Sequence, residues 1–292
     1  MLLGAAHERW QFSGYSRSQE APRTRFTRFT TVDWLVRVLP LSPVRRHLFV
    51  KDAKVFLRDV SQWVQLLPLG ALVLLYLYNF SVLDLERVPY MTGVVKNLYA
   101  FVNLAMAGFV IATVAVRFVF PAVSAEGNAF WIIRTSPVSL RDFLWSKFWN
   151  GLLPVLLLTE LLTVAANELL DVDPFLKLVA ALTIVFMTFA LVGLATGLGA
   201  RYPRFGADPT QAAGSYGGVA FMILAVLFIL LMIVLVGWPS SRYLISQTRR
   251  VHLSTLDHAA MAASFVAAIV LSLATWIGAM RFGVRGLEDM RG

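Results

Sequence analysis

The sequence predicts an all-α, polytopic membrane protein with six transmembrane helices and an amphipathic helix at the membrane surface. Of the 292 residues, 58% are hydrophobic and only 15% are charged, whereas about a quarter of the residues in an ordinary soluble domain are charged. Six apolar stretches are each long enough to cross a bilayer, which takes roughly 20 residues. This composition excludes a soluble globular enzyme, a disordered chain and a nucleic-acid-binding domain, so nucleic acid is not expected as a partner.

The six expected spans are bounded by charged or polar residues, and they occupy 64–83, 98–116, 148–167, 178–200, 219–238 and 259–280. The third contains Glu160, which should face protein or water because a charge inside a bilayer is costly. It is either a contact in a translocation path or a structural hydrogen-bonding group. The fourth contains Gly193 and Gly197 in the spacing that lets two helices approach closely.

The distribution of basic residues predicts the orientation of the chain. An even number of spans places both termini on one side, and if that side is the cytoplasm, the inside segments hold 20 of the 26 Lys and Arg residues. Cytoplasmic loops carry such an excess. We therefore expect a multi-pass protein of the cell's inner (plasma) membrane with both termini in the cytoplasm. The loop 239–258 is the exception, since it carries three arginines outside.

Two cytoplasmic segments, 1–42 and 43–63, precede the first span. Residues 1–42 are polar and indicate a linker or arm. The membrane domain then comprises residues 43–292, and the segment 43–63 is its first part. Ser42 and Pro43 predict a helix start, and residues 43–63 have apolar residues at helical spacing opposite a basic face with Lys51, Lys54 and Arg58. Such a helix can lie among anionic headgroups of membrane lipid. The alternative is a cytoplasmic extension of the first span.

The loop 117–147 contains the most informative pattern. The segment from Ala125 to Arg134 predicts a short helix that exposes Phe130 and Trp131. Ser139 and Asp142 have the spacing of a capping box that starts the next helix. Exposed aromatic side chains suit docking to a soluble partner, and they also suit an interfacial helix that rests on lipid. The residues alone leave both interpretations open.

Several motifs are absent from the sequence. It contains no Gly-x-x-x-x-Gly-Lys-Ser/Thr loop for nucleotide phosphates, no His-Glu-x-x-His and no Gly-x-Ser-x-Gly. It has no cysteine, and its four histidines are scattered. We therefore expect no catalytic residue, no cofactor and no metal site in this chain, and no enzymatic activity of its own.

Three motifs in consistent order resemble a family of bacterial ABC exporter permeases of the type-two class. They are KDAKVFLRDVSQWVQ before the first span, RFVFPAVSAEGNAFWIIRTSP after the second, and ARYPRFGADPTQAAGSYGG after the fourth. The string AEGNAFWIIRTSPVSLRDFLWSKF resembles the coupling-helix loop of this class. The resemblance covers most of residues 43–292 and matches the C-terminal six-span half of longer members, so the chain is expected to be a half-transporter, a split-gene product or a fragment.

The resemblance implies a function and a set of partners. The segment 126–134 would be a coupling helix that docks a separate ABC ATPase subunit through Glu126, Phe130, Trp131 and Arg134. Residues 44–63 would be the connecting helix, and 239–258 would include outward-facing re-entrant helices. ATP and Mg would be bound by the ATPase subunit.

A second six-span half, in a homodimer or as a separate first-half chain, would complete the unit. The expected function is that of a permease subunit that couples ATP hydrolysis by its partner to export of a substrate. The alternatives are a membrane scaffold that recruits a cytoplasmic complex and an intramembrane enzyme.

Overall fold

The computed structural model describes residues 43–58, 70–71, 73–75, 78, 92–169, 173–206, 209–249 and 254–290. These residues belong to one compact unit, Pro40–Gly292, and the regular secondary structure among them is helical. The expected arm 1–42 and most of the expected first span 64–83 lie outside the described residues.

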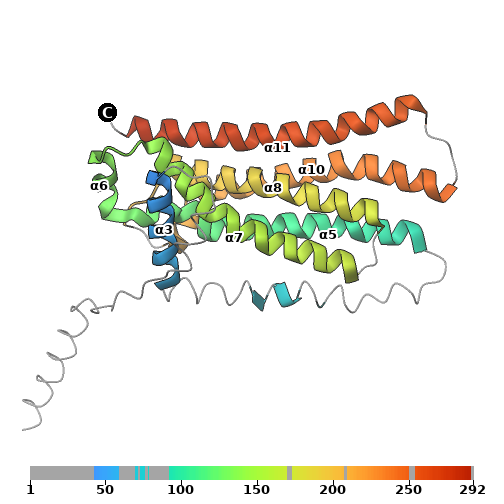
Figure 1. Cartoon of the computed structure of the whole chain (residues 1–292), viewed down its shortest axis with the longest axis horizontal. Helices are drawn as coiled ribbons and strands as arrows, with labels where there is room; N and C mark the ends of the chain where they lie inside the picture. Colours follow the sequence, from blue (N-terminus) through green and yellow to red (C-terminus); the bar gives the residue numbers. More distant parts are fainter. Residues whose placement is uncertain are drawn as a thin grey trace, which may run out of the picture. The chain divides into compact units, whose positions relative to one another are not determined.

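Five long helices in the described part of the chain could cross a membrane by length and composition. They run side by side in Figure 1, and α3 (Pro43–Arg58) lies across one end of them beside α6 (Phe130–Thr135). The five predicted spans from 98–116 onward are thus confirmed as long apolar helices. The expected total of six spans and the type-two fold are not confirmed. The five helices are α5 (Thr92–Val114) with its continuation to Gly127, α7 (Leu140–Leu169), α8 (Pro174–Arg201), α10 (Tyr216–Arg249) and α11 (Thr255–Asp289).

Helix α8 is the centre of the bundle, because it packs against α5, α7, α10 and α11. Its second half is buried without interruption from Ala190 to Ala200. Two glycines there bring α11 into backbone contact. A Cβ on Gly193 would lie 2.5 Å from a ring carbon of Trp276, and a Cβ on Gly197 would fall on the carbonyl oxygen of Ala279. The Gly193-x-x-x-Gly197 spacing therefore serves a close helix crossing.

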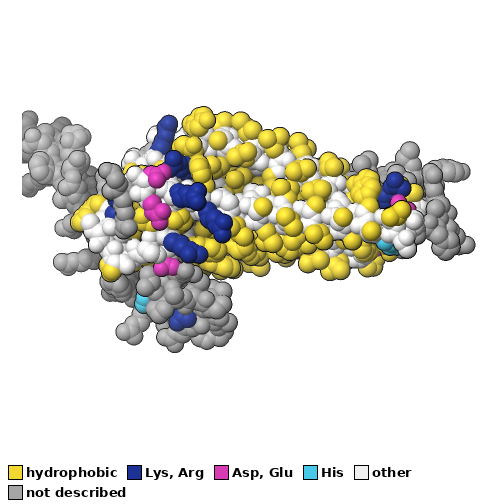
Figure 2. All heavy atoms as spheres, turned by 90° about the horizontal axis from the view of Figure 1, so that it is seen from above, with side chains coloured by type: hydrophobic (Ala, Val, Ile, Leu, Met, Phe, Trp, Pro, Cys, Tyr) yellow, Lys and Arg dark blue, Asp and Glu magenta, His cyan; other side chains and the backbone are white. Residues whose placement is uncertain are grey.

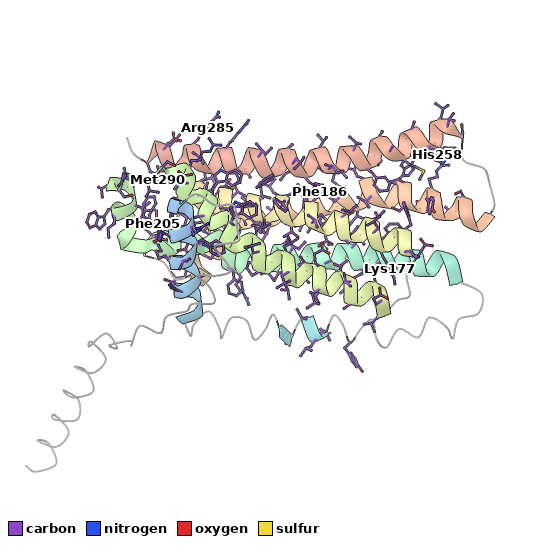
Figure 3. The ribbon with its side chains drawn as sticks, in the orientation of Figure 1. Lys177, Phe186, Phe205, His258, Arg285 and Met290 are labelled. Atoms are coloured by element: carbon purple, nitrogen blue, oxygen red, sulfur yellow. The ribbon has the colours of Figure 1, made fainter. Side chains whose placement is uncertain are left out.

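The two ends of the bundle differ in charge. We call the polar end the one formed by α3, residues 115–139, residues 201–206 and 209–215, and the last turns of α11. Figure 3 shows Phe205, Arg285 and Met290 at this end and Lys177 and His258 near the other. Figure 2 shows basic and acidic side chains gathered beside the apolar middle at the polar end. The described residues of the loops 117–147 and 199–217 and the end of α11 thus share one end, as the topology prediction requires.

The expected re-entrant helices in 239–258 are wrong for the described residues. Helix α10 continues through Pro239 to Arg249, and α11 begins at Thr255 after a capping box at Ser254. A proline inside a helix leaves the carbonyl four residues earlier without its usual donor. Here that carbonyl belongs to Leu235, and the hydroxyl of Ser264 on α11 donates to it at 2.6 Å. The neighbouring helix thus supplies the missing hydrogen bond, and α10 need not end.

The connection from α5 to α6 is not the single helix expected from Ala125 to Arg134. A π-helical turn (Ala115–Val119) and two 3₁₀ segments (Phe120–Ala122 and Ser124–Ala129) lead into α6. Gly127 has φ of 53°, which interrupts the helical path just before α6. A glycine adopts this left-handed conformation without the steric cost that a Cβ brings. The helix after the break is therefore only six residues long.

Candidate functional site at the polar end

Glu126 is the centre of a charged cluster that joins three segments far apart in the sequence. Its carboxylate accepts hydrogen bonds from the Nζ of Lys51 on α3 at 2.8 and 2.9 Å and from the Nζ of Lys147 on α7 at 2.5 Å. Lys147 also lies 2.9 Å from Asp52, and Asn150 donates to Asp52 at 3.3 Å. We call these five residues the Glu126 cluster.

Burial makes this cluster more than a surface ion pair. The side chains of Lys147, Glu126 and Asp52 are only 8%, 11% and 15% exposed, whereas Lys51 is 44% exposed. Burial alone would raise the pKa of Glu126, but the charges and hydrogen bonds of Lys147 and Lys51 outweigh it and hold the pKa below the ordinary value. Exposed pairs contribute little to stability, but removing one partner of a buried pair is costly.

The cluster changes the interpretation of α3. Phe49 is buried, and the helix packs against α7, so part of α3 faces protein. Lys51, expected on the lipid-facing side, instead pairs with Glu126. Burial lowers the pKa of Lys51, but its hydrogen bond to Glu126 and the charge of Asp52 outweigh this and raise the pKa above its usual value. Lys54 is half-buried, and the side chain of Arg58 lies outside the described residues.

Phe130 was expected on the exposed face of the loop helix, and this is wrong. Its side chain is only 6% exposed. It stacks on Phe205 with ring centroids 4.8 Å apart and lies 6.0 Å from the ring of Phe143. Phe130 is thus the residue through which α6 packs on the bundle. Of the two aromatic residues predicted to dock a partner, only Trp131 therefore remains a candidate.

Trp131 and Ile132 do project from α6, with exposures of 64% and 52%. The helix that carries them is held at both ends. Glu126 precedes it in the Glu126 cluster, and Arg134 near its end donates from Nη2 to the backbone oxygen of Met290 at 2.5 Å. Two exposed apolar side chains are thereby presented on a short helix that is fixed to α3, α7 and α11.

The predicted cap at Ser139 and Asp142 forms, whereas Glu126 has different partners from those expected. The backbone N–H of Asp142 donates to the Ser139 hydroxyl at 3.0 Å, so the predicted cap at the start of α7 is confirmed. Glu126, which the resemblance made part of the docking helix, precedes the break at Gly127 and pairs with Lys51 and Lys147.

Glu160 lies far from the polar end, within the predicted third span on α7. Its side chain is half-buried, and its Oε1 atom is buried without a hydrogen-bond partner among the described residues. Next to it, Thr159 lies 3.5 Å from Thr188 on α8, hydroxyl to hydroxyl. Glu160 is therefore not part of the Glu126 cluster, and its place in a translocation path stays a prediction.

Lys147, Asp52 and Asn150 are the residues of the Glu126 cluster that the sequence analysis missed. Lys147 stands one residue before the uncharged start of a predicted span, and it was counted only as an inside charge. A lysine that interrupts the buried face of an amphipathic helix is a signal for a paired group. Here Lys147 lies between the buried residues Ser146 and Phe148. The identity of its partner could not be read from spacing, because Asp52 and Glu126 come from distant segments.

The comparisons with known proteins place the chain in a family. A family model described as "Putative ATP-binding cassette" matches residues 1–291, and the chain therefore belongs to this ATP-binding cassette family. A search of curated proteins and a search of solved structures give no match.

This finding corrects the expected function. The family is described as an ATP-binding cassette and not as a permease, so the assignment of the chain as the permease subunit of an exporter is overturned. The sequence and the fold limit which function can be assigned instead. The sequence lacks a phosphate-binding loop, and the described residues form five helices long and apolar enough to cross a membrane. The chain is thus a membrane-type, helical member of an ATP-binding cassette family.

Proposed function

We propose that the chain is a membrane-embedded component of an ATP-binding cassette system, and that its polar end docks a soluble nucleotide-binding subunit of that system. The observation that carries the proposal is the presentation of Trp131 and Ile132. Both are more than half exposed on a helix that is tied to other helices by Glu126, which precedes it, and by Arg134 in its last turn. The proposal assigns embedding and docking to this chain, and it assigns no cargo path.

The fixed position of α6 favours a protein partner over a lipid surface. A docking element that is already ordered loses little conformational freedom on binding, which improves affinity. Aromatic residues at the centre of a contact often carry much of its energy. A helix that rests on headgroups needs no such fixed geometry, because lipid adapts to it. The buried pairing of Lys147 with Glu126 is therefore better explained by a partner of defined shape.

The partner supplies what the chain lacks. Since the sequence has no loop to hold nucleotide phosphates, ATP and Mg are bound on the soluble subunit, and this chain is not itself an enzyme. The proposal also includes a first span at 64–83, a second six-span half in the assembly and a plasma-membrane location with both termini in the cytoplasm. The clustering of basic residues at the polar end supports that orientation.

Co-purification of the nucleotide-binding subunit tests the proposal. Trp131→Ala should weaken docking on the order of thirtyfold, which corresponds to about 2 kcal/mol. The membrane level of the chain should not change, because the side chain is exposed and makes no core contact. Trp238→Ala is a matched control, since Trp238 is also exposed, at 45%, but lies on α10 near the other end.

Two outcomes would count against the proposal. Equal recovery of the subunit with wild type and Trp131→Ala would show that α6 is not the docking element. Weaker association of the loop with anionic vesicles, with intact subunit binding, would show that α6 rests on lipid instead.

A further inference from the structure

A shallow apolar groove runs between α10 and α11 over a floor formed by α8. Its volume is about 450 Å³, and it is lined by Leu198, Tyr202, Tyr216, Leu224, Ala274 and Gly278, among others. Tyr202 and Tyr216 mark the end nearer the polar end, where their rings meet edge to face with centroids 5.9 Å apart. Leu224 lies eight residues further along α10, about 12 Å deeper toward the middle of the bundle.

The α11 wall of this groove continues into two arginines. Ala274, Gly278, Arg281 and Arg285 follow one another at spacings of four, three and four residues, which places them along one face of a helix. The small side chains of Ala274 and Gly278 leave room in the groove, and a Cβ on Gly278 would meet no atom within 4 Å. The groove therefore opens toward a basic rim.

Arg281 and Arg285 are both exposed, and neither forms an ion pair with a described residue. Figure 3 shows Arg285 directed away from the bundle. Arg201, by contrast, pairs with Asp289 at 2.5 Å and lies over the ring of Phe282. Arg281 and Arg285 therefore place two positive charges at this end of the groove. The nearby charge of Asp289 is already neutralised by Arg201.

We propose that this groove binds one anionic phospholipid of the surrounding bilayer. An acyl chain lies along Leu224, Ala274 and Gly278, and the phosphate lies between Arg281 and Arg285. Tyr202 and Tyr216 occupy the level between hydrocarbon and headgroups, where tyrosine is enriched in membrane proteins. The depth fits as well, since Arg281 is the first charge after the uncharged stretch 259–280.

The arginines also argue against the other obvious occupant, a helix of a second copy. Small residues such as Ala274 and Gly278 favour helix–helix contact. A helix seated along this wall would also cover Arg281 and Arg285, and it would remove both charges from water although neither has an ion-pair partner among the described residues. Burying unpaired charges is costly. A lipid phosphate brings the counter-charge with it.

Native mass spectrometry of the purified full chain tests the proposal, with dioleoyl phosphatidylglycerol and dioleoyl phosphatidylcholine as probes. Wild type should prefer phosphatidylglycerol, and either Arg281→Gln or Arg285→Gln should lower its affinity about fivefold, the effect of one basic residue near an anionic headgroup. Binding of phosphatidylcholine should not change in these variants. Arg141→Gln is the control, because Arg141 is an exposed arginine on α7 that does not line the groove.

The acyl-chain part of the site has its own test. Gly278→Leu fills the groove and should lower binding of both lipids severalfold, whereas Ala262→Leu, at an exposed position near the start of α11, should leave both unchanged. With wild type alone, glycerophosphoglycerol, which lacks acyl chains, should fail to displace bound phosphatidylglycerol.

Three results would overturn the proposal. The first is equal affinity of wild type for the two lipids. The second is displacement by the chain-free headgroup, which would remove the acyl-chain site. The third is a loss of dimer in Gly278→Leu with unchanged lipid binding, which would show that a second copy occupies the groove.

Discussion

The contact between α8 and α11 and the Glu126 cluster hold the chain together by opposite means. Where α8 meets α11, the glycines at 193 and 197 allow backbone and ring atoms to touch, so shape alone decides the contact. In the Glu126 cluster, shape matters less than charge, because two lysines and two carboxylates neutralise one another in a largely buried place. The first contact should tolerate no added atom. The second should tolerate small changes of shape and no change of charge.

The largest effect is expected where α8 crosses α11. Gly197→Leu places its Cβ on the carbonyl oxygen of Ala279, a backbone atom that cannot turn aside, so we expect a loss of more than about 3 kcal/mol or failure to assemble. Gly278→Ala is the matched control on α11, because its Cβ enters open space. Size-exclusion chromatography after graded heating would measure both. A monodisperse Gly197→Leu protein of wild-type stability would refute the account of this contact.

The next effect separates folding from docking on one short helix. Phe130→Ala removes a ring stacked on Phe205 and should cost about 3 kcal/mol of stability at the polar end. Trp131→Ala removes an exposed neighbour and should change stability by less than about 0.5 kcal/mol. Limited proteolysis of the 117–147 loop should therefore accelerate only in Phe130→Ala. Equal acceleration in both variants would mean that Trp131 also supports the fold.

A smaller effect tests the role of charge in the Glu126 cluster. Glu126→Ala leaves Lys147 buried near a single remaining carboxylate, that of Asp52, and should cost about 2 kcal/mol, below the range for a fully buried pair. Lys147→Met in the same chain removes the charge left behind and should restore much of the loss. If the double variant is no more stable than Glu126→Ala, the cluster acts by packing and not by charge.

The sequence predicted the parts of this structure that depend on local pattern. Five of the expected spans correspond to long apolar helices, residues 43–58 of the expected helix 43–63 are helical, and the cap at Ser139 forms. Each of these features is decided by the residues within one segment.

The predictions from the sequence were wrong or incomplete where segments that are distant in the sequence meet. The burial of Phe130 depends on Phe205, which is 75 positions later in the numbering, and the lysine partners of Glu126 come from α3 and α7. The continuity of α10 through Pro239 depends on the hydroxyl of Ser264 from α11. The residue pattern within one segment does not predict partners from another segment. The break at Gly127 was also missed, because a glycine inside a helical pattern does not by itself reveal a positive φ.

The smallest expected effect is the response of the cluster to pH. Because the pKa of Glu126 is lowered, its stabilising contribution is complete above the ordinary value of 4.5 and is lost as the pH falls through the lower folded value. Because the pKa of Lys51 is raised, its contribution is complete below the ordinary value of 10.5 and is lost as the pH rises through the higher folded value.

The gap in apparent unfolding temperature between wild type and Glu126→Gln should therefore be constant at neutral pH and should narrow only below pH 4.5. A gap that already narrows between about pH 6 and 7, where histidine titrates, would point to a different group.

Labelling of single cysteines tests most directly whether the chain is embedded with its polar end in the cytoplasm. The sequence contains no cysteine, so Thr135→Cys on α6 and His258→Cys near the opposite end each introduce a single thiol at an exposed position. In intact cells, an impermeant maleimide should label His258→Cys and should label Thr135→Cys only after the membrane is permeabilised. Labelling of Thr135→Cys in intact cells would contradict the account, because α6 could not then meet a cytoplasmic nucleotide-binding subunit.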